Sequence, residues 1–520
     1  MRIRWMTLSA LALAAVPLSF LQPWHKPETI MLASGPVARL DTALHGYPKG
    51  ARPRQKLASQ TSGTTRRWSV RLATPKYLSG VVEGFYGPTW SNRNTIQVFK
   101  FMSQHHLNTF VYAPKNATYL RKSWNQPYPA PALTHLAELA VAARGLHINF
   151  VVSISPGLSM IYSSATDRKA LLAKINQLRS IGVQNFMLSF DDIPQTLDAA
   201  DQAVYGNNLG RAQSALTNYV LGAETQSNPG FHLMFTPTVY WGVSATPYWD
   251  SLRQYLNPAI PVAWTGPNVL SQTITTEDVK DAQGALGHPL IIWDNYPVND
   301  YSYVMDHKPQ LFMGPVVGRQ ARVVGAVKGY LFNPMLQPLA SEVALWTAAS
   351  FLRDPSGYNA SRSWGRAVAA IGGKAAPAFK IFCEDSSASF LDPSASNAVA
   401  SEAPAFWSQY QSRGNLKTTG LYRTFAAMAQ VNAQLAHNLR PGLYQEIKPW
   451  AQQLSLEGSA GVSTIEILER NLEGQVVPAS ASNSTLAALN QAMSSPITLG
   501  VSAAVNQWMA TAKALSPLAP

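Results

Sequence analysis

The chain has 520 residues, of which 46% are apolar and 10% aromatic, so it can bury large cores and is not an intrinsically disordered protein. Its length predicts two to four domains. Lys and Arg outnumber Asp and Glu by 41 to 28, which gives a net charge of +13, but the basic residues are scattered and form no run longer than Arg66-Arg67. Because a basic stripe is missing, the composition favours a cationic globular protein over a nucleic-acid-binding one.

The amino terminus has the pattern of an export signal. Arg2 and Arg4 precede an uncharged run, rich in Leu and Ala, from Trp5 to Trp24. Residues 1–26 are therefore predicted to be a signal peptide of a secreted or cell-surface protein, with an uncleaved membrane anchor or tether as the alternative. Residues 27–78 carry Gly, Pro, Ser and basic residues with little periodicity, and this composition predicts a linker or a small appendage.

Eight short apolar runs of strand length follow, separated by amphipathic stretches. The runs cover residues 80–87, 108–114, 147–156, 184–192, 232–240, 259–267, 289–297 and 327–334. Their nearly continuous apolar content suits strands buried on both faces of a parallel sheet. In one intervening stretch, Thr166-Asp167 forms a candidate helix N-cap, and the apolar residues after it recur at helical spacing. Eight strand–helix units predict an α/β fold, a (β/α)8 barrel over 79–355, with a doubly wound open sheet as the alternative.

Polar and aromatic residues follow almost every predicted strand, at the barrel end where active sites lie. They include Glu83–Gly87, Lys115, Asp191-Asp192, Tyr240, Trp264–Gly266, Trp293, Asn295 and Asn333. An Asp-Asp pair after a strand is by itself commonly a turn or a helix cap. A whole ring of hydrogen-bonding groups with tryptophans instead indicates a sugar site, because aromatic faces pack against the C–H side of a pyranose.

The sequence does not contain the residue patterns of a disulfide, a zinc site or a dinucleotide-binding loop. The single cysteine, Cys383, cannot form an intramolecular disulfide, and no Cys/His cluster has the spacing of a zinc site. Gly84 and Gly87 do not match the glycine spacing of a dinucleotide-binding loop. The sequence therefore predicts no metal and no cofactor.

Six motifs in this region resemble glycoside hydrolase family 84, the O-GlcNAcases and the bacterial β-N-acetylglucosaminidases often labelled hyaluronidases. The motifs are GVVEGFYGPTW (80–90), YAPK (112–115), SFDDI (189–193), WTGP (264–267), WDNYPVNDY (293–301) and FNPM (332–335). They occur in the family's order and span the whole predicted barrel. One departure follows Lys115, where members typically continue with two aspartates and this chain has Asn116-Ala117.

The resemblance implies retaining hydrolysis in which the 2-acetamido oxygen of the substrate attacks the anomeric carbon, so that no enzyme carboxylate is the nucleophile. Asp191 is then expected to accept the acetamido N–H, and Asp192 to act as general acid and then as general base. An ionised Asp191 would make the ionisation of Asp192 harder. Adjacent residues on a strand face opposite ways, so both can reach one site only where the strand ends and turns.

The resemblance also implies a set of substrate-binding residues. Asn295, Asp300 and Asn333 are expected to bind the sugar hydroxyls and the acetamido group, with Lys115 and the backbone at Gly84 also contacting hydroxyls. Tyr240 and Trp293 are expected to line the acetamido pocket, and Thr265 is a further candidate. For each of them the alternative is a side chain that only packs the barrel mouth.

The carboxy-terminal part, 356–520, is predicted to be a helical domain, with breaks at 440–442, 457–458 and 473–474. Its aromatic residues are expected to pack between helices.

Two functions stay open. The first is an exported exo-β-N-acetylglucosaminidase acting on glycans or glycoproteins, and the second is a non-catalytic glycan-binding protein on the same barrel. The natural aglycone is left open between glycoprotein, chitin fragment, peptidoglycan and hyaluronan.

Overall fold

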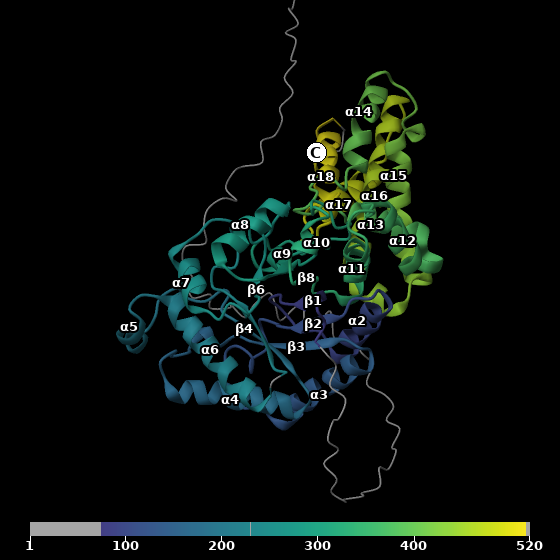
Figure 1. Ribbon diagram of the computed structural model, residues 1–520. Helices are drawn as coiled ribbons and strands as arrows, with labels where there is room; N and C mark the ends of the chain where they lie inside the picture. Colours follow the sequence, from purple (N-terminus) through teal and green to yellow (C-terminus); the bar gives the residue numbers. More distant parts are fainter. Residues whose placement is uncertain (1–73, 229, 516–520) are drawn as a thin grey trace, which may run out of the picture. The chain divides into compact units, whose positions relative to one another are not determined.

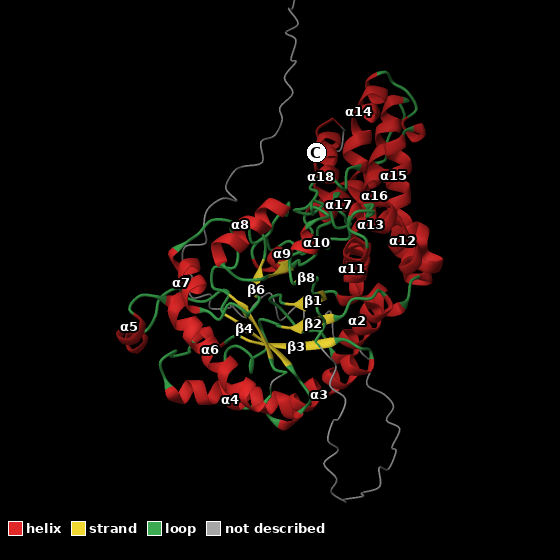
Figure 2. Cartoon of the chain, in the orientation of Figure 1, coloured by secondary structure: helices red, strands yellow, loops and turns green. Residues whose placement is uncertain are grey.

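The computed structural model describes residues 74–228 and 230–515, and these contain a closed barrel of eight parallel strands. The strands are β1 (Leu78–Glu83), β2 (Thr109–Tyr112), β3 (Asn149–Ile154), β4 (Asn185–Ser189), β5 (His232–Thr236), β6 (Val262–Trp264), β7 (Leu290–Asp294) and β8 (Gly329–Phe332). Each strand pairs with the next in sequence, and β8 pairs with β1, with Gly80 beside Leu331. All eight predicted strands are thus confirmed, and the open sheet is excluded because the barrel closes (Figures 1 and 2).

Helices follow the strands and cover the outside of the barrel (Figure 2). They are α2 (Asn92–Gln104), α3 (Ala130–Gly145), η2 (Pro156–Leu158), α4 (Ala165–Ser180), α5 (Ala199–Tyr205), α6 (Leu209–Ser227), α7 (Pro247–Tyr255), α8 (Thr276–Leu286), α9 (Asp300–Val304), α10 (Val323–Ala326) and α11 (Pro338–Arg353). The predicted N-cap of α4 was wrong. The helix begins earlier, because the Ser164 side chain accepts a hydrogen bond from the Asp167 N–H.

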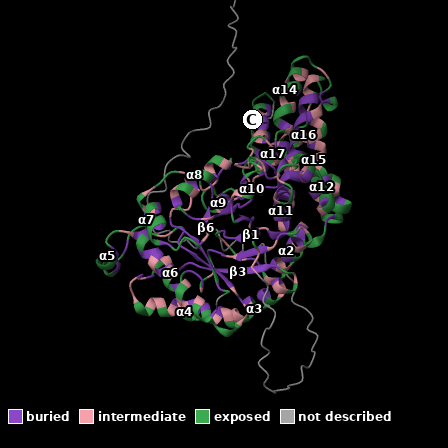
Figure 3. Cartoon of the chain, viewed as in Figure 1, coloured by how far each residue is buried: buried purple, intermediate pink, exposed green. Residues whose placement is uncertain are grey.

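Alternation along the strands separates two buried layers, because successive side chains point to opposite faces. One layer fills the barrel interior and consists of Leu78, Val82, Val111, Ala113, Val151, Met187, Met234, Ala263, Ile291, Trp293 and Leu331. The strands are almost completely buried (Figure 3), as expected for a sheet that packs on both faces. The residues that continue this alternation beyond the carboxyl end of each strand, every second residue along the chain, have side chains that face the barrel mouth.

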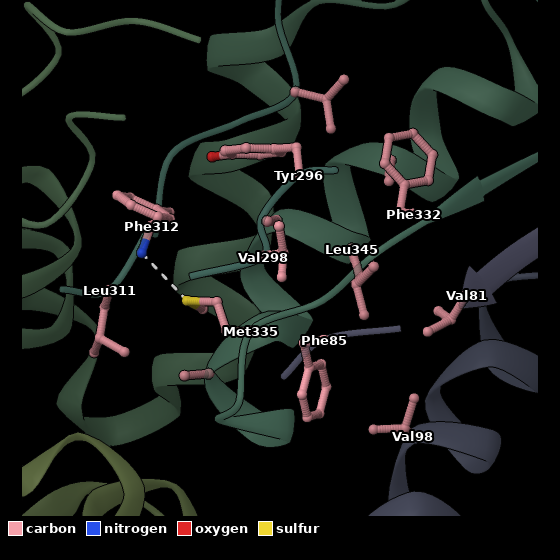
Figure 4. Packing of buried hydrophobic residues seen from close by; sticks show 14 of the residues in the cluster. Val81, Phe85, Val98, Tyr296, Val298, Leu311, Phe312, Phe332, Met335 and Leu345 are labelled. Carbon is pink, nitrogen blue, oxygen red and sulfur yellow. Dashed lines mark hydrogen bonds between the residues drawn. The ribbon is translucent and has the colours of Figure 1, made fainter. Parts of the chain in front are cut away.

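The second layer lies between the strands and the helices. Figure 4 shows part of it, where Val81 and Phe85 from β1 and the loop after it pack near Phe332 of β8 and Leu345 of α11. In the same cluster the Phe312 N–H donates to Met335 Sδ at 3.2 Å. This layer therefore fixes the loops that follow β1, β7 and β8.

The remaining described residues are helical. The elements are α12 (Ala360–Gly372), η3 (Gly373–Ala375), α13 (Ala376–Asp385), α14 (Ala398–Gln411), η4 (Leu416–Thr418), α15 (Gly420–Asn438), α16 (Pro441–Leu472), α17 (Ala479–Met493) and α18 (Ser502–Leu515). The predicted breaks at 440–442 and 473–474 are confirmed. The aromatic side chains pack between helices as predicted, with Trp508 stacked on Trp407 at 5.8 Å and edge-on to Phe406 at 5.4 Å.

The predicted break at Glu457-Gly458 was wrong, since α16 runs through both residues. A Cβ at Gly458 would lie 2.4 Å from the Ala429 nitrogen, and a Cβ at Gly461 would lie 2.4 Å from the Phe425 ring. These glycines therefore let α15 and α16 approach closely, and they do not end the helix.

The predicted export segment and appendage, up to residue 73, lie outside the described residues, so export and the membrane tether stay predictions. Among the described helices, none combines the length and the apolar character needed to span a membrane.

Candidate active site

The interior alternation brings most of the predicted site residues to the barrel mouth. One to three steps of two past the interior positions of the strands lie Gly84, Lys115, Asp191, Tyr240, Thr265, Asn295 and Asn333. Trp293 is itself an interior position, 4% exposed. A Cβ at Gly84 would lie 2.0 Å from the Trp293 ring, so only glycine lets the chain directly after β1 pass this close to the indole.

Asp191 is buried and forms an ion pair with Lys115 through Oδ2. Its other oxygen, Oδ1, has no hydrogen-bond partner among the described residues. The Lys115 ammonium also lies 5.3 Å from the centroid of the Trp293 ring. Lys115, predicted to bind a sugar hydroxyl, therefore also offsets the charge of Asp191, and this reduces the repulsion that the sequence analysis expected between Asp191 and Asp192.

Asp192 is exposed, and its backbone is in the left-handed region with φ +53°. A regular strand would turn this side chain away from Asp191, and the left-handed turn brings it back to the mouth. Two tyrosine hydroxyls donate to it, Tyr86 to Oδ2 and Tyr240 to Oδ1, both at 2.9 Å. Burial, and then the charge of Asp192, raise the pKa of Tyr240 well above 10, so its hydroxyl is a neutral donor.

A chain of amides lies on the β7–β8 side of the mouth. The Trp293 indole N–H donates to Asn295 Oδ1 at 3.0 Å, and Asn333 Nδ2 donates to the same oxygen at 2.9 Å. Asn333 Oδ1 accepts from the Gly84 N–H at 3.1 Å, and Asn295 Nδ2 donates to the Val269 carbonyl at 2.9 Å. These predicted residues therefore share one network that fixes the orientation of both amides.

Asp300 is the first residue of α9, and its Oδ2 accepts from the Tyr86 N–H at 2.8 Å. Burial raises the pKa of Asp300, and the N–H donors of Tyr86 and Tyr301 partly oppose that shift. The buried Asn299 side chain before it donates to the Gln310 carbonyl at 2.8 Å and accepts from the Leu336 N–H at 3.0 Å. The loops after β7 and β8 are thus tied together directly beneath Asp300.

The helical region supports this side of the mouth. The Trp450 indole of α16 donates to the Pro309 carbonyl at 3.0 Å, and the Thr498 N–H donates to the same oxygen at 3.2 Å. Glu446 of α16 accepts from the Leu339 N–H at 2.8 Å and so caps α11, the helix after β8. The helices after the barrel therefore hold the segments that carry Asp300 and Asn333.

Thr265 is buried, and its hydroxyl donates to the Asn268 carbonyl at 2.9 Å within its own loop. Its hydroxyl is thus engaged in the turn, and a role in substrate binding stays a prediction.

Two residues of the mouth were not among the predicted site residues. Tyr86 follows Gly84 by one step of two, so the interior alternation could have identified it. Arg121 lies in the long loop after β2, donates to the Asp192 carbonyl at 2.8 Å and to Tyr86 Oη at 3.1 Å, and has no comparable signal in the sequence. In the described part of the chain, no group of three or more His, Cys, Asp or Glu side chains is placed to hold a metal ion.

Known proteins are similar to this chain in both sequence and fold. A family model described as β-N-acetylglucosaminidase matches residues 79–384, and one described as hyaluronidase post-catalytic domain-like matches residues 398–503. The chain belongs to glycoside hydrolase family 84. It is 35% identical over 286 residues to the protein O-GlcNAcases of Rattus norvegicus and Mus musculus, a match that covers 54% of this chain and 30% of each relative.

Two solved structures extend this likeness beyond the barrel. A variant of the O-GlcNAc hydrolase of Thermobaculum terrenum superposes with a TM-score of 0.76 at 29% identity, covering 84% of this chain and 94% of that one. The protein titled CpGH84B superposes with a TM-score of 0.72 at 26% identity, covering 84% of this chain and 77% of that one. The family membership therefore rests on the barrel and on the helices after it.

Proposed function

We propose that this chain is a retaining exo-β-N-acetylglucosaminidase that uses the 2-acetamido group of its own substrate as the nucleophile. The observation that carries the proposal is the contrast between two adjacent carboxylates at the mouth. Asp191 is buried and paired with Lys115, whereas Asp192 is exposed and held by two tyrosine hydroxyls. Different surroundings are what separate the roles of two carboxyl groups in one site.

In the first step Asp191 Oδ1 accepts the acetamido N–H, because this oxygen is buried with no other partner among the described residues. The acetamido oxygen then attacks the anomeric carbon, and the bond to the leaving oxygen breaks as Asp192 gives that oxygen a proton. The positive charge that develops on the resulting oxazolinium-like ring is stabilised by the carboxylate of Asp191.

In the second step Asp192 takes a proton from water, and the water oxygen attacks the anomeric carbon from the face that the leaving group occupied. The acetamido group reforms, and the product keeps its β configuration. Two displacements at one carbon give this retention without a covalent bond to the enzyme. The exposure of Asp192 supports its role, because both leaving group and water must reach it.

The mouth favours a terminal sugar over an internal one. Asp300 and its neighbours are assigned to hydroxyls of a terminal residue, and Asp300 would repel the carboxylate of an adjacent uronate. The net charge of +13 attracts the polyanion hyaluronan, but salt screens that attraction. We therefore expect single N-acetylglucosamine units to be released from glycoconjugates, and hyaluronan to be bound weakly at low salt and hardly shortened.

The decisive experiment is hydrolysis of an aryl β-N-acetylglucosaminide by the purified protein, with a thiazoline mimic of the oxazoline as inhibitor. Hydrolysis with tight inhibition supports the proposal. Sugar binding without hydrolysis would support the alternative, a glycan-binding protein on the same barrel. On hyaluronan, a rapid fall in viscosity with little free monosaccharide would contradict the exo assignment.

A further inference from the structure

Arg121 is the charged side chain nearest to the proposed acid that the mechanism above does not use. It is 8% exposed and lies in the loop between β2 and α3. That loop is fixed immediately before Arg121, because the Ser155 N–H donates to the Leu120 carbonyl at 2.8 Å and Lys174 Nζ donates to the Tyr119 carbonyl at 2.9 Å. The guanidinium is therefore held against the site by a braced segment.

The guanidinium makes two contacts that both lead to Asp192. One nitrogen donates to the Asp192 main-chain carbonyl at 2.8 Å, and the other donates to Tyr86 Oη at 3.1 Å, with the guanidinium 5.5 Å from the ring centroid. The planar fork of arginine can serve two acceptors in a fixed geometry, which a lysine ammonium does not reproduce. Arg121 thus bridges the backbone of the acid and the tyrosine that holds its side chain.

Each contact has a consequence for the acid. A left-handed aspartate is a strained backbone conformation that persists only where its surroundings fix it, and the hydrogen bond to its carbonyl supplies such a constraint. A tyrosine hydroxyl has one proton. Because Arg121 donates to Tyr86 Oη, the single Tyr86 proton is left to point at Asp192 Oδ2, where the 2.9 Å contact lies.

We propose that Arg121 is a positioning residue for the general acid, which holds Asp192 in its left-handed turn and aims the Tyr86 hydroxyl proton at its carboxylate. This inference rests on the proposed function, since it assigns a supporting role within the same site. Arg121 acts only through Asp192, and protonation of the leaving group is the part of the reaction in which the acid form of Asp192 is used. Arg121 should therefore matter most for substrates whose leaving group needs a proton.

The test compares Arg121→Met, Arg121→Lys and Tyr86→Phe on two N-acetylglucosaminides, one with an acidic nitrophenol leaving group and one with an alkyl alcohol. General acid catalysis is worth about 10²–10⁴-fold, so a misplaced acid should lose about 10–100-fold in kcat on the alkyl substrate. We expect less than about threefold on the nitrophenyl substrate and little change in KM. Arg121→Lys should lose less kcat on the alkyl substrate than Arg121→Met does. In a protein that already carries Asp192→Ala, Arg121→Met should lower kcat by less than about a further twofold.

Arg168 supplies a matched control because it has the same kinds of partner away from Asp192. It donates to the Tyr162 carbonyl at 2.8 Å and to Tyr205 Oη at 2.7 Å, and it lies 5.3 Å from the Tyr219 ring centroid. Arg168→Met should leave the ratio of the two rates unchanged.

Equal losses on both substrates, or a loss that persists in the Asp192→Ala background, would overturn the assignment of Arg121. If Arg121→Met does not fold, Arg121→Lys and Tyr86→Phe carry the same comparison. A wild-type protein that hydrolyses neither substrate would refute the proposed function itself. An active wild type whose Arg121 variants lose the same factor on both substrates would refute only this inference.

Discussion

The two sides of the barrel mouth differ in how their polar groups are satisfied. On the β7–β8 side, the side chains of Asn295 and Asn333 form hydrogen bonds with each other, with the Trp293 indole and with the backbone. On the β4 side, Asp191 keeps one buried oxygen without a partner among the described residues, and Asp192 is exposed. Under the proposed mechanism, the groups assigned to binding are thus oriented before the substrate arrives, and the groups assigned to the reaction keep hydrogen-bonding capacity for the substrate. The predictions below test this division.

The largest effect is expected for Asp192→Ala. On glycosides of alkyl alcohols the variant should lose about 10²–10⁴-fold, the usual contribution of general acid catalysis. On acidic phenol leaving groups it should lose far less, since these depart without a proton. Steady-state kinetics on both substrate types measure the gap. An equal loss of rate on both substrate types would show that Asp192 is not the general acid.

Asp191→Asn should slow every 2-acetamido substrate, whatever its leaving group. The variant keeps the shape of the side chain but loses the charge that stabilises the oxazolinium-like ring, an electrostatic contribution of about 10²–10³-fold. The measurement is kcat across a set of aryl glycosides. A loss that depends on the leaving group in the manner of Asp192→Ala would contradict the division of roles.

Asn333→Ala should lose about tenfold in kcat/KM and equally across leaving groups, because it removes one member of the binding network and leaves the Gly84 N–H without its acceptor. Thr265→Val is the matched comparison. Its hydroxyl bonds within its own loop, so we expect less than about twofold. A larger loss of kcat/KM for Thr265→Val than for Asn333→Ala would contradict the assignment of Asn333 to the binding network and of the Thr265 hydroxyl to its own loop.

A smaller effect concerns stability, because the helical region that supports the β7–β8 side buries ionisable groups. Burial raises the pKa of Glu446 from 4.5 to about 8 against the opposing bonds from two N–H groups, and burial raises the pKa of Asp385 to about 8. The folded state binds these protons more tightly than the unfolded state, so the contribution of these two groups to stability is fullest below their ordinary pKa values of 4.5 and 3.8 and is lost as the pH rises to about 8.

Glu446→Gln keeps the oxygen that caps α11 and removes the charge, so it should raise the unfolding temperature by a few degrees near pH 8 and by less at pH 5. The exposed Glu473→Gln should change neither value. Thermal unfolding followed by circular dichroism at both pH values provides the readout. A destabilised Glu446→Gln at pH 8 would show that the group is needed as a carboxylate.

Much of this architecture was predictable, because strand alternation and strand ends are local signals. All eight strands were found, and the step of two from Val82 through Gly84 leads to Tyr86, which the sequence analysis quoted but did not assign. Arg121 could not be found in this way, since its place depends on how a long loop folds back on β4. The break expected at Gly458 failed for a similar reason. A glycine that ends a helix and one that admits a neighbouring helix look alike in sequence.

The central claim is that the acetamido oxygen of the substrate is the nucleophile, and the most direct measurement replaces hydrogens of that acetyl group by fluorine. The aryl glycosides with N-acetyl, N-fluoroacetyl, N-difluoroacetyl and N-trifluoroacetyl groups share one leaving group and differ in the nucleophilicity of the carbonyl oxygen. The account predicts that kcat/KM falls steeply with each added fluorine. A rate independent of fluorine content would contradict it and would require another nucleophile, either a side chain or water itself.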